Sequence, residues 1–139
     1  MGAIDQAVGN PILDVLLPNG SSGTLTLGAL TLTLPFKCVF TSTLGTAAAN
    51  GTAIQAGVSI AGLFTSAAAS VSNVPTKSNT GTISITVSGA GGTWAGCEIY
   101  DSTGTPKRVL YGPSSSLAKA YNTGDILAVN TGNATGTVQ

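Results

Sequence analysis

The sequence predicts an all-β fold, an antiparallel β-sandwich or jelly-roll-like barrel of six to eight short strands with a short N-terminal helical segment. Three observations lead to this prediction. Apolar and polar residues alternate over several short segments, which is typical of half-buried strands. Clusters of Gly, Asn, Ser and Pro separate these segments at intervals of roughly ten residues. The first residues of the chain instead follow helical spacing, and 139 residues suit one domain.

The N-terminal residues 1–20 are interpreted as a helical arm, and residues 21–139 as the β-sandwich domain. Asn10 is a good N-cap and Pro11 suits the first position of a helix, so two helical turns are expected, over residues 3–8 and 11–17. A segment this short must dock to be stable, on its own domain or on a partner protein. Its apolar residues are the candidate partner-binding set, Ile4, Val8, Ile12, Leu13, Leu16 and Leu17.

The longest uninterrupted alternation runs over residues 30–40 and predicts one half-buried strand. Its apolar face consists of Leu30, Leu32, Leu34, Phe36, Cys38 and Phe40. Because proline cannot donate a ladder hydrogen bond, Pro35 indicates a sheet edge or a bulge. Further strands are expected over residues 58–65, 82–88, 95–100, 107–111, 125–129 and 135–138, with Ile83, Ile85 and Val87 facing inward.

The segment from Trp94 to Pro113 has the pattern of a complete β-hairpin, with its turn at residues 101–106. Asp101 is interpreted as a turn residue that accepts backbone N–H groups, and Asp125 as a polar strand start. Tyr100 and Tyr111 are expected to pair across the hairpin. The outward side chains of this hairpin form a possible second contact surface, which consists of Glu98, Tyr100, Lys107 and Arg108.

Charged residues make up 7% of the chain against about 25% in an average protein, and the net charge is zero. Nucleic acid is not an expected partner, because phosphate binding needs clustered basic residues. A membrane span is not expected either, because no apolar run approaches about 18 residues. The N-terminus has no secretory-signal pattern, so synthesis in a cytoplasm is expected. The scarcity of charge indicates permanent assembly, so a homo-oligomer is expected, with a trimer as the working hypothesis.

The chain contains no histidine, which excludes Ser-His-Asp and Cys-His mechanisms and the commonest zinc ligand. No enzyme activity, metal or cofactor is predicted. Cys38 and Cys97 are interpreted as free buried thiols, with a disulfide left open. Residues 89–92 lack the lysine and the helix of a phosphate loop. The aromatic residues leave one alternative open, a sugar-binding platform on the surface formed by Trp94, Tyr100, Tyr111 and Tyr121. Trp94, however, is expected in the core or at an interface.

Two stretches carry a family resemblance, A-I-D-Q-A-V-G-N-P-I-L-D-V-L-L at the start and G-C-E-I-Y-D-S-T-G-T-P-K-R-V-L-Y-G-P, followed by N-T-G-D, near the end. Together they resemble small virion proteins of actinobacterial phages, which are variously labelled tail fibre, minor structural or capsid decoration proteins. The central part of the chain shares only its Gly, Ala, Thr and Ser character with them.

The resemblance implies a virion structural protein. A capsid decoration protein on the outer surface of the assembled head is the preferred position, because the chain has no heptads or repeats of a fibre shaft. Such a protein would bind the major capsid protein and stabilise the head or present an adhesive surface. A minor tail or tail fibre component is the first alternative, and a carbohydrate-binding β-sandwich module is the second.

Overall fold

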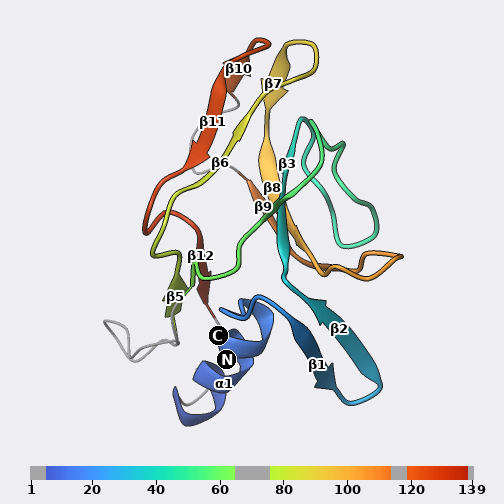
Figure 1. Cartoon of the computed structure of the whole chain (residues 1–139), viewed down its shortest axis with the longest axis vertical. Coiled ribbons are helices and arrows are strands. Elements are labelled where there is room, and N and C mark those ends of the chain that lie inside the picture. The colour runs from blue at the N-terminus through green and yellow to red at the C-terminus, as the bar shows by residue number, and fades with distance from the viewer. Residues whose placement is uncertain (1–5, 65–75, 114–118, 138–139) are drawn as a thin grey trace.

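The computed structural model describes residues 6–64, 76–113 and 119–137 (Figure 1). Within these ranges the chain forms one helix, α1 (Gln6–Leu16), and twelve short strands, all paired antiparallel. The predicted all-β fold with an N-terminal helix is therefore confirmed. No helix in these ranges is long and apolar enough to cross a membrane.

The strands form one four-stranded sheet and four two-stranded sheets. The four-stranded sheet has the order β4 (Val58–Ser59), β3 (Lys37–Thr41), β8 (Gly96–Tyr100) and β9 (Arg108–Pro113). The two-stranded sheets pair β1 (Gly23–Leu27) with β2 (Leu30–Leu34), β5 (Thr76–Ser78) with β12 (Thr135–Thr137), β6 (Ile83–Thr86) with β11 (Ile126–Val129), and β7 (Gly92–Trp94) with β10 (Lys119–Tyr121).

A single hydrophobic core joins these sheets. One face of β3 contributes Cys38 and Phe40, and the β6–β11 pair contributes Ile83, Ile85 and Leu127. These five side chains are at most 4% exposed, and Val87 is buried as well. The predicted inward positions 83, 85 and 87 are therefore confirmed, and the two sheets are held together by the burial of apolar surface.

The strand predicted over residues 30–40 is broken at Pro35, which corrects the prediction. Residues before the break form β2 and pair with β1, whereas residues after it form β3 and pair with β4 and β8. Pro35 has no N–H for a ladder bond, so the chain changes sheets at this point. The alternation survives the break, because Leu32, Phe36, Cys38 and Phe40 are all buried, although Leu30 is exposed.

The two helical turns predicted on either side of Asn10 are also corrected, because Pro11 lies inside the single helix α1. The proline removes one backbone hydrogen bond, but the helix continues across it. Burial of Leu13 and Leu17 on one side of the helix stabilises the continuous form, and the Leu17 N–H donates to the Leu13 carbonyl at 2.8 Å. Residues 3–5 of the first predicted turn lie outside the described residues.

The number of strands exceeds the predicted six to eight because the strand predicted over residues 30–40 is divided in two and because β1, β5, β7 and β10 have weak sequence patterns. The strand expected over residues 58–65 is reduced to β4, since the chain turns at Gly62, where φ is +72°. The strands expected from 82, 95, 107, 125 and 135 onward correspond to β6, β8, β9, β11 and β12.

Candidate functional site

The outer face of the four-stranded sheet, defined as the face that carries Val39, Glu98 and Tyr100, lies opposite the core. Glu98 was predicted to point into solvent, but it is 1% exposed, so this prediction is wrong. The segment that follows β3 folds back over the outer face and covers Glu98. In this covering segment, the Gly51 N–H donates to Glu98 Oε1 at 2.8 Å.

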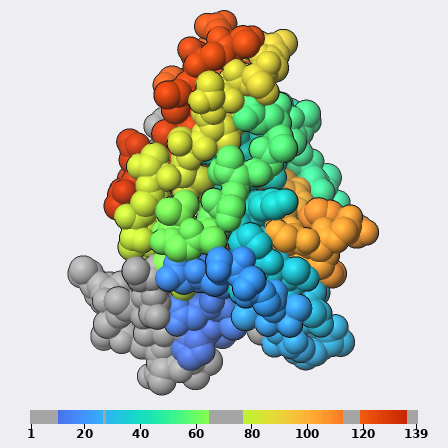
Figure 2. Space-filling view, in the orientation of Figure 1, coloured from blue at the N-terminus to red at the C-terminus, as the bar shows by residue number. Residues whose placement is uncertain are grey.

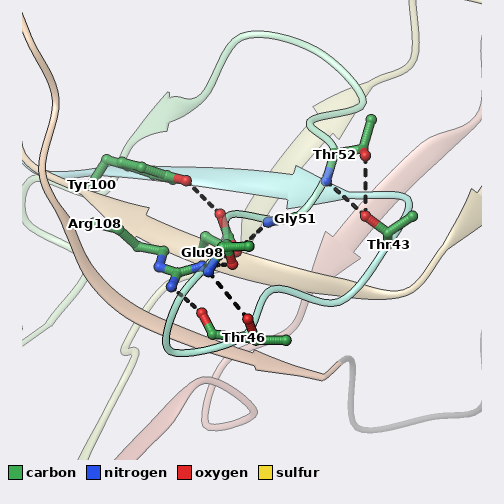
Figure 3. Close-up of polar contacts among 8 residues, drawn as sticks. Thr43, Thr46, Gly51, Thr52, Glu98, Tyr100 and Arg108 are labelled. Atoms are coloured by element: carbon green, nitrogen blue, oxygen red, sulfur yellow. Dashed lines mark hydrogen bonds and ion pairs between the residues drawn. The ribbon is translucent and has the colours of Figure 1, made fainter.

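Glu98 is the centre of a buried polar cluster (Figure 3). Arg108 Nη1 donates to Glu98 Oε1 at 2.8 Å, and the Tyr100 hydroxyl donates to Glu98 Oε2 at 2.5 Å. The two charged side chains are 2% and 12% exposed for Glu98 and Arg108. Because both carboxylate oxygens are bonded, the buried negative charge is compensated, as a stable interior requires.

Arg108 also fastens the covering loop to the sheet. Its guanidinium donates to the carbonyl oxygen of Ala49 at 2.8 Å and to the carbonyl oxygen of Thr46. A side chain at Gly45 would overlap Glu98 Oε1, so a glycine is required where the loop passes over the carboxylate. The planar, five-donor guanidinium is suited to hold two carbonyls and a carboxylate together.

The protonation states of the cluster follow from its geometry. Burial opposes ionisation of Glu98, but hydrogen bonds from Tyr100 and Gly51 and the adjacent Arg108 outweigh it, so the pKa of Glu98 is lowered. Burial, together with the hydrogen bond to the Glu98 carboxylate, raises the pKa of Tyr100 to about 12. Glu98 is therefore ionised and Tyr100 protonated at neutral pH.

Around this cluster lies an uncharged surface that we call the loop face, which consists of Leu44, Thr46, Ala47, Ala48, Ala49 and Tyr111. Every one of these residues is exposed, with Leu44 at 55% and Tyr111 at 48%. The Leu44 side chain lies over Gly96. Arg108 connects Tyr111 to the loop, because its guanidinium lies 4.5 Å from the Tyr111 ring centroid and also donates to the Ala49 carbonyl. The exposed Leu44 and Tyr111 side chains are thus held in place by their contacts with Gly96 and Arg108.

The predicted second contact surface is only partly formed as expected. Lys107 is exposed, and its Nζ donates to the Thr31 carbonyl at 3.2 Å, whereas Tyr100 and Arg108 are half-buried. The expected pairing of Tyr100 with Tyr111 is wrong, because a register shift next to Tyr100 places it opposite Arg108, and Tyr111 lies opposite Glu98. Of the four predicted residues, Glu98 and Arg108 contact the loop after β3, whereas Lys107 contacts Thr31.

The interpretation of Asp101 as a turn residue is confirmed. Its Oδ1 accepts the Lys107 N–H at 2.6 Å and the Thr103 hydroxyl at 3.0 Å, and its Oδ2 accepts the Thr33 N–H at 3.1 Å. Burial works against the ionised form, but these donors together lower the pKa of Asp101. Asp125 lies immediately before β11, and its Oδ2 accepts the Asn122 N–H at 2.8 Å, as a residue at a strand start does.

The N-terminal segment packs on its own domain. Leu13 and Leu17 are 2% and 3% exposed, so these two predicted partner-binding residues are unavailable to a partner, while Ile12 and Leu16 are half-buried. Figure 2 shows the chain after α1 against the green segment near residue 60, and the Gly62 N–H donates to the Asn19 carbonyl at 3.2 Å. Val8 belongs to α1, and Ile4 lies outside the described residues.

A second ion pair ties α1 to the body. Lys77 Nζ on β5 donates to Asp14 Oδ1 at 2.6 Å, with the two side chains 2% and 40% exposed. The apolar burial of the helix and this ion pair act at the same end of the molecule, where α1 contacts β5. The helix is therefore an integral part of the fold.

The aromatic residues do not assemble into a surface platform. Trp94 packs on Phe40 with a centroid separation of 5.4 Å, and its Nε1 donates to the Gly96 carbonyl at 2.8 Å. Tyr121 is buried in the core, so Tyr111 is the exposed tyrosine among the described residues. Of the two positions expected for Trp94, the core or an interface, the structure shows a partly buried ring packed against the core.

Cys38 and Cys97 are both free, as interpreted from the sequence, with Cys38 buried and Cys97 half-buried. The contact with Cys97 and burial raise the pKa of the Cys38 thiol, which therefore stays protonated. In residues 6–64, 76–113 and 119–137, no three His, Cys, Asp or Glu side chains are placed to hold a metal ion.

Sequence reasoning missed the loop face because Leu44 and Ala47–Ala49 form no periodic pattern. The available signal was the absence of charge from residue 38 to 76, together with Gly45 and Gly51 on either side of the alanines. Comparisons of the chain with family models, curated proteins and solved structures found no match.

Proposed function

We propose that the protein is a structural component of a phage virion, a capsid decoration protein that binds the outer surface of the assembled head through the loop face. The resemblance of the N-terminal and hairpin segments to virion proteins supports the virion assignment. The observation that carries the choice of surface is the buried Glu98–Arg108 pair, which holds a charge-free loop beside the exposed ring of Tyr111.

The loop face has properties that suit a protein interface. An exposed Tyr is one of the residue types that dominate binding energy at interfaces, and the neighbouring Leu and small residues add uncharged contact surface. Because Arg108 fixes the loop backbone before binding, little conformational entropy is lost on contact. Many copies on a lattice make a modest affinity at each site effectively permanent.

The burial of Leu13 and Leu17 shifts the proposed gripping element from the N-terminal segment to the loop face. The major capsid protein remains the proposed partner, and trimeric assembly on the shell remains the proposed arrangement.

The proposal is tested by localisation on purified particles of the phage whose genome encodes the chain. Gold-labelled antibodies against the folded protein are expected to decorate the head uniformly. Labelling confined to the tail would contradict the decoration role and support a tail component, and the absence of any label on intact particles would contradict a virion role.

A further inference from the structure

A cleft of about 420 Å³ opens on the outer face, on the far side of Glu98 from Tyr111. Val39 and Tyr100 lie on its sheet side, residues 50–57 form one wall, and residues 101–106 form the other. Its size is in the range of small-ligand sites, roughly 300–1,000 Å³. The proposed shell contact at the loop face uses none of these residues.

The Tyr100 ring is held in one position on the sheet. Its hydroxyl is bonded to Glu98 two residues earlier on the same strand, so the side chain lies along the outer face toward Glu98 (Figure 3). Because the hydroxyl is already occupied, the part of Tyr100 left for a ligand in the cleft is the ring itself. A fixed aromatic ring offers apolar contact at small entropic cost.

Most polar groups around the cleft are bonded within the protein. The Asp101 oxygens hold Lys107, Thr103 and Thr33, and the Ser102 hydroxyl donates to the Pro35 carbonyl. In contrast, the described part of the chain provides no hydrogen-bond partner for the Lys37 ammonium or the Asn50 side-chain amide, and both residues are exposed. These two groups are free to bind a ligand.

We infer that this cleft binds a sugar residue that carries a carboxylate, such as a hexuronic acid. One face of a pyranose ring is apolar and suits the Tyr100 ring, while its peripheral hydroxyls suit the Asn50 amide. The carboxylate suits Lys37, which lies directly opposite Tyr100 in the sheet register. A doubly charged phosphate fits less well, because Asp101 lines the same cleft and Lys37 is the cation that lines it.

The inference is tested with the 139-residue protein and a matched pair of ligands, methyl β-glucuronide and methyl β-glucoside, which differ only in having a carboxylate or a hydroxymethyl group at C5. In ¹H–¹⁵N spectra both sugars are expected to shift amides of residues 50–57 and 100–106, with affinity on the order of millimolar because the site is small and open. The glucuronide is expected to bind about tenfold more tightly.

The variants Lys37→Gln and Asn50→Ala change exposed side chains and leave the fold intact. Lys37→Gln is expected to remove the tenfold preference for the glucuronide, Asn50→Ala to weaken both sugars, and the control Lys119→Gln on β10 to change neither. The absence of shifts at the cleft, shifts confined to other regions, or a glucuronide preference that survives Lys37→Gln would overturn the inference. Binding to the virion is measured separately, so either proposal can fail alone.

Discussion

The two regions that were predicted to contact partners, the N-terminal segment and the hairpin of residues 94–113, each take part in one ion pair, but the two pairs are built differently. In the Glu98–Arg108 pair the side chains are 2% and 12% exposed, whereas in the Lys77–Asp14 pair the acid is 40% exposed. The first pair shapes an exposed loop, and the second anchors a helix on the body. The comparison teaches that this chain uses four of its few charged side chains to hold segments in place, while others, such as Lys37, stay exposed.

The largest expected effect follows from removing the charge of Glu98. Glu98→Gln leaves the Arg108 guanidinium buried without its carboxylate, so the free energy of unfolding is expected to fall by about 3–5 kcal/mol. Urea denaturation measures this change, with Lys119→Gln as a surface control. In a double-mutant cycle with Arg108→Gln, a coupling near zero would mean that the pair does not hold the loop.

Asp14→Asn is expected to have a smaller effect, about 2–3 kcal/mol: it leaves the Lys77 ammonium, 2% exposed, without a charged partner, but water that reaches the 40% exposed Asp14 side chain solvates that ammonium in part. The two variants should also differ in location. Hydrogen exchange is expected to accelerate in α1 for Asp14→Asn and at the Gly51 amide for Glu98→Gln. Equal acceleration at both places in either variant would show that the two regions are one cooperative unit.

Tyr100→Phe removes one donor from Glu98 but keeps the ring and the Arg108 pair. The expected loss is about 1 kcal/mol, since the second carboxylate oxygen is left without its hydrogen bond. Thermal unfolding checks the value. A loss as large as that of Glu98→Gln would place the hydroxyl, rather than the guanidinium, as the main support of the carboxylate.

The smallest expected effect is the change of the free energy of unfolding with pH near neutrality. The folded-state pKa values of Glu98 and Asp101 are lowered below unfolded values of about 4.3 and 3.9, so their stabilisation is present above these values and is lost as pH falls through the folded-state pKa values. Unfolding free energy is expected to be level from pH 5 to 8 and to drop below about pH 4. A drop of equal size in Glu98→Gln would exclude Glu98 as a source.

Local pattern was sufficient to predict much of the fold. The alternation at Ile83, Ile85 and Val87 and the turn chemistry of Asp101 depend on residues close in sequence, and both predictions are confirmed. The burial of Glu98 was not predictable in this way, because the covering loop lies about fifty residues earlier in the sequence. The same holds for α1, whose docking depends on the distant Lys77.

The central claim, that the Glu98–Arg108 cluster presents a loop face that binds the phage head, is tested most directly by co-sedimentation with purified heads. The double variant Leu44→Ser/Tyr111→Ala removes the two large exposed side chains of the loop face, and Ile126→Ser removes one of similar exposure on β11. Binding is expected to fall at least about tenfold in the double variant and to stay at the wild-type level in Ile126→Ser. Wild-type binding by the double variant, or no binding by the wild-type protein, would contradict the claim.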